Sequence, residues 1–134
     1  MTGKAQKVVR VYMGEDRRSH FEDVQVPMGE FRLGTLFSYK TEMAGVSGVV
    51  FRENPLDGSP DFHTPPRRQF VITLVGAVEL QVGDGSTRVF GPGDVLFAED
   101  VEGEGHSARE LLGPRRSLIL PVPDAFDFRA WVGG

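Results

Sequence analysis

The stretch that decides the fold class is QFVITLVGAVELQVGDGSTRVFGPGDVLFA, residues 69–98. It contains short runs of β-branched and aromatic residues separated by glycine-containing turns, a pattern typical of consecutive strands. The sequences GDG at 83–85 and GPGD at 91–94 are turns of the kind that joins hairpins. In the first run Phe70 and Ile72 point to one face, and Gln69 and Val71 to the other. We expect strands over 69–75, 78–82, 87–90 and 95–98, with a hairpin around Gly76-Ala77.

The same spacing of apolar runs and turns continues on both sides of this stretch. The chain of 134 residues has 17 glycines and 9 prolines spread between these runs, which favours an all-β sandwich or barrel. Further strands are expected over 8–12, 21–26, 31–39, 45–52 and 117–122. Residues 53–67, ENPLDGSPDFHTPPR, hold four prolines and predict mostly irregular chain. A short C-terminal helix is expected within 124–131. The length predicts one domain, 1–134, with an N-terminal arm of strands (1–30), a barrel core (31–122) and a tail (123–134).

Composition excludes several classes of function. The net charge is −4 and acids and bases are mixed along the chain, so binding to nucleic acid is not expected. There is no cysteine, which excludes disulfides and thiol nucleophiles. No run approaches the roughly 20 apolar residues that cross a bilayer, and the N-terminus lacks the apolar core of a secretion signal. A cytoplasmic protein without membrane partners is therefore expected.

Two of the three histidines are placed where a binding site is expected. His63 precedes the strand at 69–75, and His106 follows the strand at 95–98. If the strands form one sheet that closes on itself, both side chains reach the same mouth. The third, His20, lies in a polar segment and is interpreted as a surface or interface residue. No G-x-S-x-G nucleophile elbow and no phosphate-binding loop with its lysine is present.

The residues around the two histidines resemble the two motifs of the cupin family. In DFHTPPRRQFVITLVG, from Asp61 to Gly76, His63 matches the second motif histidine, Gln69 lies near the motif glutamate and Gly76 matches the closing glycine. The second motif is matched by Gly93-Asp94 and, at its end, by His106. PRRQ together with EDVEGEGH also resembles a subgroup of small bacterial cupins. The resemblance implies an antiparallel jelly-roll β-barrel with a central pocket, and a homodimer.

The resemblance also implies a metal site, from which this chain departs. Metal-binding cupins use three histidines and a glutamate to hold iron, manganese, nickel or zinc, whereas this chain has Asp61 at the first histidine position and Gln69 at the glutamate position. Neutral glutamine is a weak ligand for such ions. We therefore favour a pocket without metal or other cofactor. If a divalent metal binds, the expected ligands are His63, His106, Gln69 and Asp61, with Glu99 or Asp100 as other oxygen ligands.

Acid–base chemistry is the function that these residue types favour. His63, His106 and Glu99 are the candidate catalytic residues, because imidazole and carboxylate groups transfer protons. Only one of Glu99 and Asp100 is expected to face the pocket, where it could act as a general base. An ion pair with Arg67, Arg68 or Arg109 is the alternative role for that acid. The candidates for binding substrate are Gln69, Arg67, Asp100 and Asp61. For Gln69 a bond to the backbone at the strand start, and for Arg67 a solvated turn, are the alternatives.

Two classes of function follow from this pocket. The first is an enzyme of small-molecule or natural-product metabolism, of the isomerase, cyclase or lyase type. The second is a non-catalytic binding or sensing protein that uses the same pocket. A bound metal with two histidines and one carboxylate would add an oxygenase as a further alternative.

Overall fold

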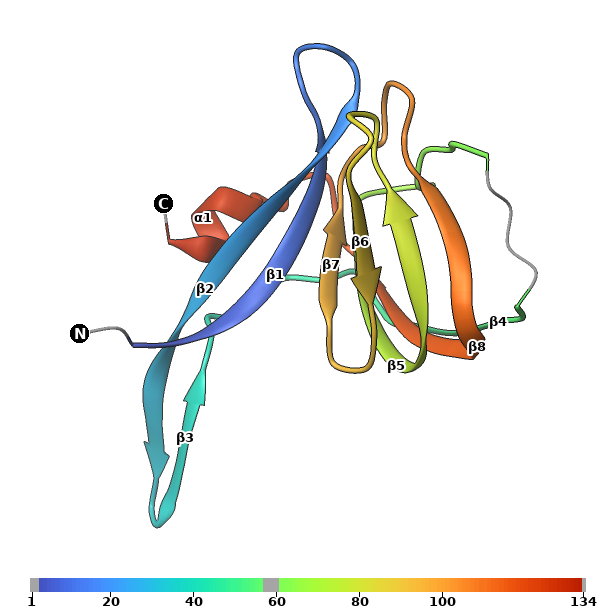
Figure 1. Cartoon of the computed structure of the whole chain (residues 1–134). Helices are drawn as coiled ribbons and strands as arrows, with labels where there is room; N and C mark the ends of the chain where they lie inside the picture. The colour runs from blue at the N-terminus through green and yellow to red at the C-terminus, as the bar shows by residue number, and fades with distance from the viewer. Residues whose placement is uncertain (1–2, 57–60, 134) are drawn as a thin grey trace.

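A single large sheet dominates the computed structural model, which describes residues 3–56 and 61–133. Strands make up 57% of the chain and helix 4%, so the predicted all-β class is confirmed. The eight strands lie in the order β3-β2-β1-β7-β5-β8-β4, with β6 paired to β5 outside this path (Figure 1). The sheet is mixed and it is not closed, because β1 and β7 run parallel and β3 and β4 lie at its two ends. The expectation of a purely antiparallel, closed barrel is therefore met only in its β content. The bounds are β1 Lys4–Met13, β2 Ser19–Leu33, β3 Leu36–Lys40, β4 Val50–Asn54, β5 Gln69–Gln81, β6 Thr87–Phe90, β7 Val95–Ala98, β8 Ser107–Pro121 and α1 Phe128–Val132.

The predicted hairpin around Gly76-Ala77 is wrong, because β5 continues through it. β5 pairs with β8 from Gln69 opposite Pro121 to Gln81 opposite Ser107, with register shifts in the middle. Gly76 has φ +85°, and a Cβ there would lie 2.4 Å from the carbonyl oxygen of Leu112. Glycine therefore bends the strand where we expected it to reverse the chain. The bend lets one strand take two further partners, β7 along its first residues and β6 along its last.

The two turns that bound β6 form as predicted. The Asp84 carboxylate accepts a hydrogen bond from the backbone N–H of Ser86 (2.8 Å), and Gly85 has φ +93°. At the other turn the Asp94 carboxylate accepts from the N–H of Gly91 (2.8 Å). The predicted strands 87–90 and 95–98 match β6 and β7 residue for residue.

The N-terminal strands build an arm. β1 and β2 form a long hairpin, and the second half of β2 continues into a hairpin with β3 that extends away from the rest of the sheet (Figure 1). The expected strand 31–39 is thus two strands with a turn at Gly34, whose φ is +60°. The expected strand 45–52 is shorter and shifted, as β4. The expected strand 117–122 is the end of the much longer β8. Homodimerisation stays a prediction.

Two clusters of apolar side chains form the core on opposite faces of the sheet. One is aliphatic apart from Phe90, and it includes Val71, Leu80 and Leu96. The other contains Phe70, Phe97 and Phe128 and is covered by α1, which begins after the N-cap Asp127 within the predicted 124–131 region and ends one residue beyond it. No helix in the described parts of the chain has the length and apolar character needed to cross a membrane. Of the segment predicted to be irregular, residues 57–60 lie outside the described residues.

Candidate functional site

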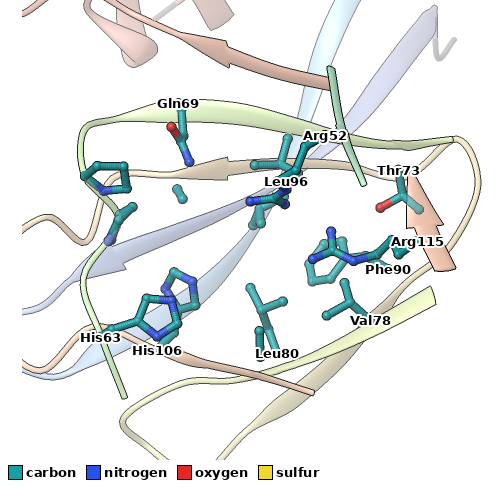
Figure 2. A pocket seen from close by; sticks show the side chains of 15 residues that line it. Arg52, His63, Gln69, Thr73, Val78, Leu80, Phe90, Leu96, His106 and Arg115 are labelled. Carbon is teal, nitrogen blue, oxygen red and sulfur yellow. The ribbon is translucent and has the colours of Figure 1, made fainter. Parts of the chain in front are cut away.

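A cavity of about 130 Å³ lies against the aliphatic face of the sheet (Figure 2). Its wall is mostly hydrocarbon from β5, β6 and β7. Polar side chains enter it at two places, one around His63 and His106 and one around Arg52 and Arg115 (Figure 2). The lining residues are Arg52, His63, Pro65, Pro66, Gln69, Val71, Thr73, Val78, Leu80, Phe90, Leu96, Ala98, His106, Ala108 and Arg115. An apolar pocket with a few convergent polar groups is the usual form of a small-molecule site.

The two predicted histidines are direct neighbours. The N–H of His63 donates to the carbonyl of His106 (2.9 Å), and the N–H of His106 donates to the carbonyl of His63 (3.0 Å). Their ring centroids are 5.4 Å apart. His63 is exposed and His106 is buried, so one ring lies at the mouth of the cavity and the other inside it.

Gly105 makes this close approach possible. Its φ is +75°, and a Cβ there would lie 2.0 Å from the carbonyl oxygen of His63. The Oγ of Ser19 donates to the carbonyl of Gly105 (2.6 Å) and accepts from the N–H of Gly83 (2.9 Å). The loop before His106 is therefore fixed from both sides, and the imidazole has a defined position.

The acid that faces the histidines is Asp100. The Nδ1–H of His106 donates to Oδ2 of Asp100 (2.7 Å), and Asp100 has an exposed fraction of 0%. Its other oxygen, Oδ1, is buried without a hydrogen-bond partner. A carboxylate on Nδ1 fixes the ring orientation and the tautomer, which leaves Nε2 as the nitrogen available for proton transfer. Asp100 rather than Glu99 is thus the acid in contact with His106, although neither carboxylate is part of the cavity lining.

Gln69 lies at the start of β5, where its side chain is buried and lines the cavity. Among the hydrogen bonds of the described residues, none involves its side-chain amide, so the alternative role of satisfying the backbone is not realised there. The amide keeps a donor and an acceptor for a ligand.

The other predicted site residues lie outside the cavity lining. The carboxylate of Glu99 pairs with the guanidinium groups of Arg10 and Arg68 on the other face of the sheet. Arg67 and Asp61 are exposed, and the Asp61 backbone carbonyl accepts a hydrogen bond from Nδ1 of His63 (3.2 Å). The structure therefore places His63, His106 and Gln69 in the lining and Asp100 behind His106, and it leaves Glu99, Arg67 and the Asp61 side chain away from them.

Two arginines that the sequence did not single out line the cavity, Arg52 from β4 and Arg115 from β8. Arg115 is buried and makes a bidentate ion pair with Glu110, through Nε (2.7 Å) and Nη2 (3.0 Å). Arg52 makes no ion pair with any residue in the described ranges. Burial is the main cause that lowers the pKa of Arg52. The charge of Arg115 adds to it, and the charge of Glu110 opposes it. The only available signal in the sequence was a charged residue next to the apolar run VVF.

Within the described residues, no three His, Cys, Asp or Glu side chains are grouped as metal ligands would be. The predicted metal ligands were His63, His106, Gln69 and Asp61. In the structure Nδ1 of the buried His106 ring is bound to Asp100, and Asp61 is exposed. A metal would have to be held by the two Nε2 atoms and by Gln69, a weak ligand.

Comparison with known proteins adds no family name to this geometry. No protein-family model matches the chain, and no curated protein matches it.

Proposed function

We propose that this protein is an enzyme that binds a compact organic molecule in the cavity and acts on it by proton transfer. The observation that carries the proposal is the His106–Asp100 pair at the wall of a largely apolar cavity. A histidine whose tautomer is held by a buried carboxylate is a common general base or acid. The reaction class is isomerase, cyclase or lyase, in small-molecule or natural-product metabolism.

The geometry gives each polar group a distinct task. Asp100 accepts from Nδ1 of His106, so Nε2 can take a proton from a bound substrate and return it at another atom. Gln69 can donate to and accept from a substrate oxygen. Hydrocarbon from Val71 and Leu80 limits the access of water to the reacting atoms. His63 at the mouth can exchange protons with solvent.

A cupin architecture is part of the same proposal. It is supported by the pairing of His63 with His106, which are the residues that match the histidines of the two motifs. It is also supported by the cavity between them and the hydrophobic face of β5. One feature departs from a cupin jelly roll: the sheet of this chain is mixed and is not closed into a barrel.

The proposal is tested by hydrogen–deuterium exchange at carbon. The protein is incubated in D₂O with neutral carbonyl compounds that carry an acidic C–H, such as cyclohexanone and phenylacetaldehyde, and the loss of the C–H signal is followed by NMR. We expect catalysed exchange with at least one compound, and a fall of at least about 100-fold in His106→Gln, the lower end of what a general base contributes.

The matched control is His20→Gln. His20 also contacts carboxylates, those of Asp16 and Asp84, but it lies outside the cavity lining. Exchange that is equal in His106→Gln and the wild type, or binding without any exchange, would overturn the enzymatic proposal and favour a binding or sensing protein. Stoichiometric iron, manganese, nickel or zinc in protein purified without chelator would overturn the metal-free mechanism and favour an oxygenase.

A further inference from the structure

We infer that Arg52 is an anion-binding residue and that the ligand of this protein is a compact monocarboxylic acid. The inference rests on the cavity of the proposed function and names the class of molecule that the cavity takes. It starts from a difference between the two arginines of the lining.

Arg52 lies in a row of polar side chains that crosses three strands. In the β4–β8 register Arg52 is opposite Ser117, and in the β5–β8 register Ser117 is opposite Thr73. Residues directly opposite one another lie on the same face of a sheet. Thr73 and Ser117 are 2% and 1% exposed, and Oγ of Ser117 has no hydrogen-bond partner. This face of the sheet therefore presents unused hydrogen-bonding groups beside the guanidinium.

Of the two arginines in the cavity lining, Arg52 is the one that makes no direct ion pair with a described residue, and Glu110 acts on its charge only from a distance. The charge of Arg115 is neutralised by Glu110 in a bidentate pair, whereas Arg52 makes no hydrogen bond or ion pair with a described residue. The Nε atom of Arg52 is buried and has no acceptor. Arg52 as a whole is half-buried. Guanidinium keeps its proton in proteins, and withdrawing part of a charged group from water without a partner is costly. An anionic ligand would remove that cost.

The dimensions and charge of the cavity select the kind of anion. A cavity of about 130 Å³ is close to the roughly 150 Å³ that accommodates benzene, so one ring or a short branched chain fits. One free positive charge matches a monoanion. Carboxylate also matches the planar fork of an arginine, which binds it bidentately. Leu80, Leu96 and His106 belong to the same lining as Arg52 (Figure 2), so the hydrocarbon of a ligand held at Arg52 would lie along the two leucines, with its far end towards His106.

The test compares three single-ring probes by isothermal titration calorimetry: benzoate, neutral benzamide and dianionic phenyl phosphate. We expect the wild type to bind benzoate at least about 10-fold more tightly than benzamide. In Arg52→Met the affinity for benzoate should fall by about 10- to 100-fold, the size expected for charge-assisted hydrogen bonds, and the affinity for benzamide should change less than about 2-fold. Arg52→Lys keeps the charge without the planar fork and should give an intermediate affinity for benzoate.

The matched control is Arg116→Met, an exposed arginine of β8 whose ion pair with Glu53 lies outside the cavity lining. It should bind all three probes as the wild type does. Thermal melting shows whether Arg52→Met is folded. If this variant is unfolded, the inference is decided by comparing the affinities for the three probes in the wild type and in Arg52→Lys. Equal affinity for benzoate and benzamide, tighter binding of phenyl phosphate, or no binding of benzoate would each overturn the inference. The exchange experiment uses neutral compounds, so a preference for benzoate without catalysed exchange would overturn the proposed enzyme and leave the carboxylate site standing.

Discussion

The two faces of the sheet are built from adjacent residues of the same strands, yet one is filled and the other is hollow. On β5 and β7, Phe70 and Phe97 point to one face, and Val71, Leu96 and Ala98 point to the other. The aromatic face is closed by α1: Phe97 packs on Phe70 (centroids 4.7 Å apart) and stacks on Phe128 (4.8 Å, 9° between the ring planes). The aliphatic face leaves the cavity open. The alternation of aromatic and aliphatic residues along β5 and β7 therefore separates a structural face from a binding face.

The polar groups of the two faces differ in the same way. Beside the aromatic face, the carboxylates of Glu22 and Glu99 are shared among arginines: Glu22 pairs with Arg10 and Arg129, and Glu99 with Arg10 and Arg68. Around the cavity, Nε of Arg52 and Oδ1 of Asp100 are buried without partners. Unsatisfied buried groups are few in folded proteins, and they concentrate at functional sites. The contrast supports a ligand in the cavity of the hollow face.

The largest effect is expected from removing an aromatic side chain of the filled face. Phe97→Ala should lower the free energy of unfolding by about 3–5 kcal/mol, because Phe97 is 0% exposed and touches aromatic rings on both sides. Urea denaturation monitored by circular dichroism measures the change. Val89→Ala, at an exposed position of β6, is the control and should change it by less than about 0.5 kcal/mol. A loss below about 1 kcal/mol in Phe97→Ala would show that this face is not tightly packed.

Enlarging a side chain is expected to have a smaller effect on the free energy of unfolding, with opposite signs on the two faces. Ala98→Val puts methyl groups into the cavity and should raise the free energy of unfolding by about 0.5–2 kcal/mol while weakening benzoate binding. Val8→Leu adds a methylene to the filled face, where Val8 is buried, and should lower the free energy of unfolding by about 1–3 kcal/mol. The same denaturation experiment measures both variants. If both destabilise the protein equally, the difference in packing between the faces is not real.

The separation of the faces was predictable from sequence only in part. The alternation in residues 69–73 and the turns around β6 follow local rules, and both are correct in the structure. Gly76 was misinterpreted because a glycine with positive φ serves equally well in a turn and in a bent strand. The first half of β8 was missed because its charged, half-exposed residues show no apolar run, and it is a strand because β5 supplies the hydrogen bonds.

The site was predictable to a similar degree. His63, His106 and Gln69 could be placed from their positions at strand ends. The choice of Asp100 over Glu99 could not, because both lie just after β7 and their directions depend on how the chain leaves the strand. Arg52 was missed because a single charged residue in a strand is usually exposed. Its inward direction follows from its register with Ser117 and Thr73, which is a property of the folded sheet.

The smallest effect is expected from the ion pairs beside the filled face. Hydrogen bonds from Arg129 are the main cause that lowers the pKa of Glu22, and Arg10 adds to them, against the opposing effect of burial. A carboxylate with a lowered pKa in the folded state stabilises the protein fully above the pKa of the unfolded chain. That contribution is lost as the pH falls through the acidic range towards the folded-state pKa. Because Arg129 and part of Glu22 are solvent-exposed, the contribution should stay below about 1 kcal/mol.

Titration of the Glu22 side-chain carboxyl by NMR checks this prediction. Arg129→Met should raise the pKa of Glu22 towards the ordinary value of a glutamate, since it removes the main cause of the shift. Arg109→Met, which removes an exposed partner of Glu79, should leave the pKa of Glu22 unchanged. If Arg129→Met changes the Glu22 titration no more than Arg109→Met does, the pairs beside the filled face are not formed in solution. The missing ion pair of Arg52 would then no longer distinguish the cavity face from the aromatic face, and the argument for Arg52 would rest on the burial of its Nε atom alone.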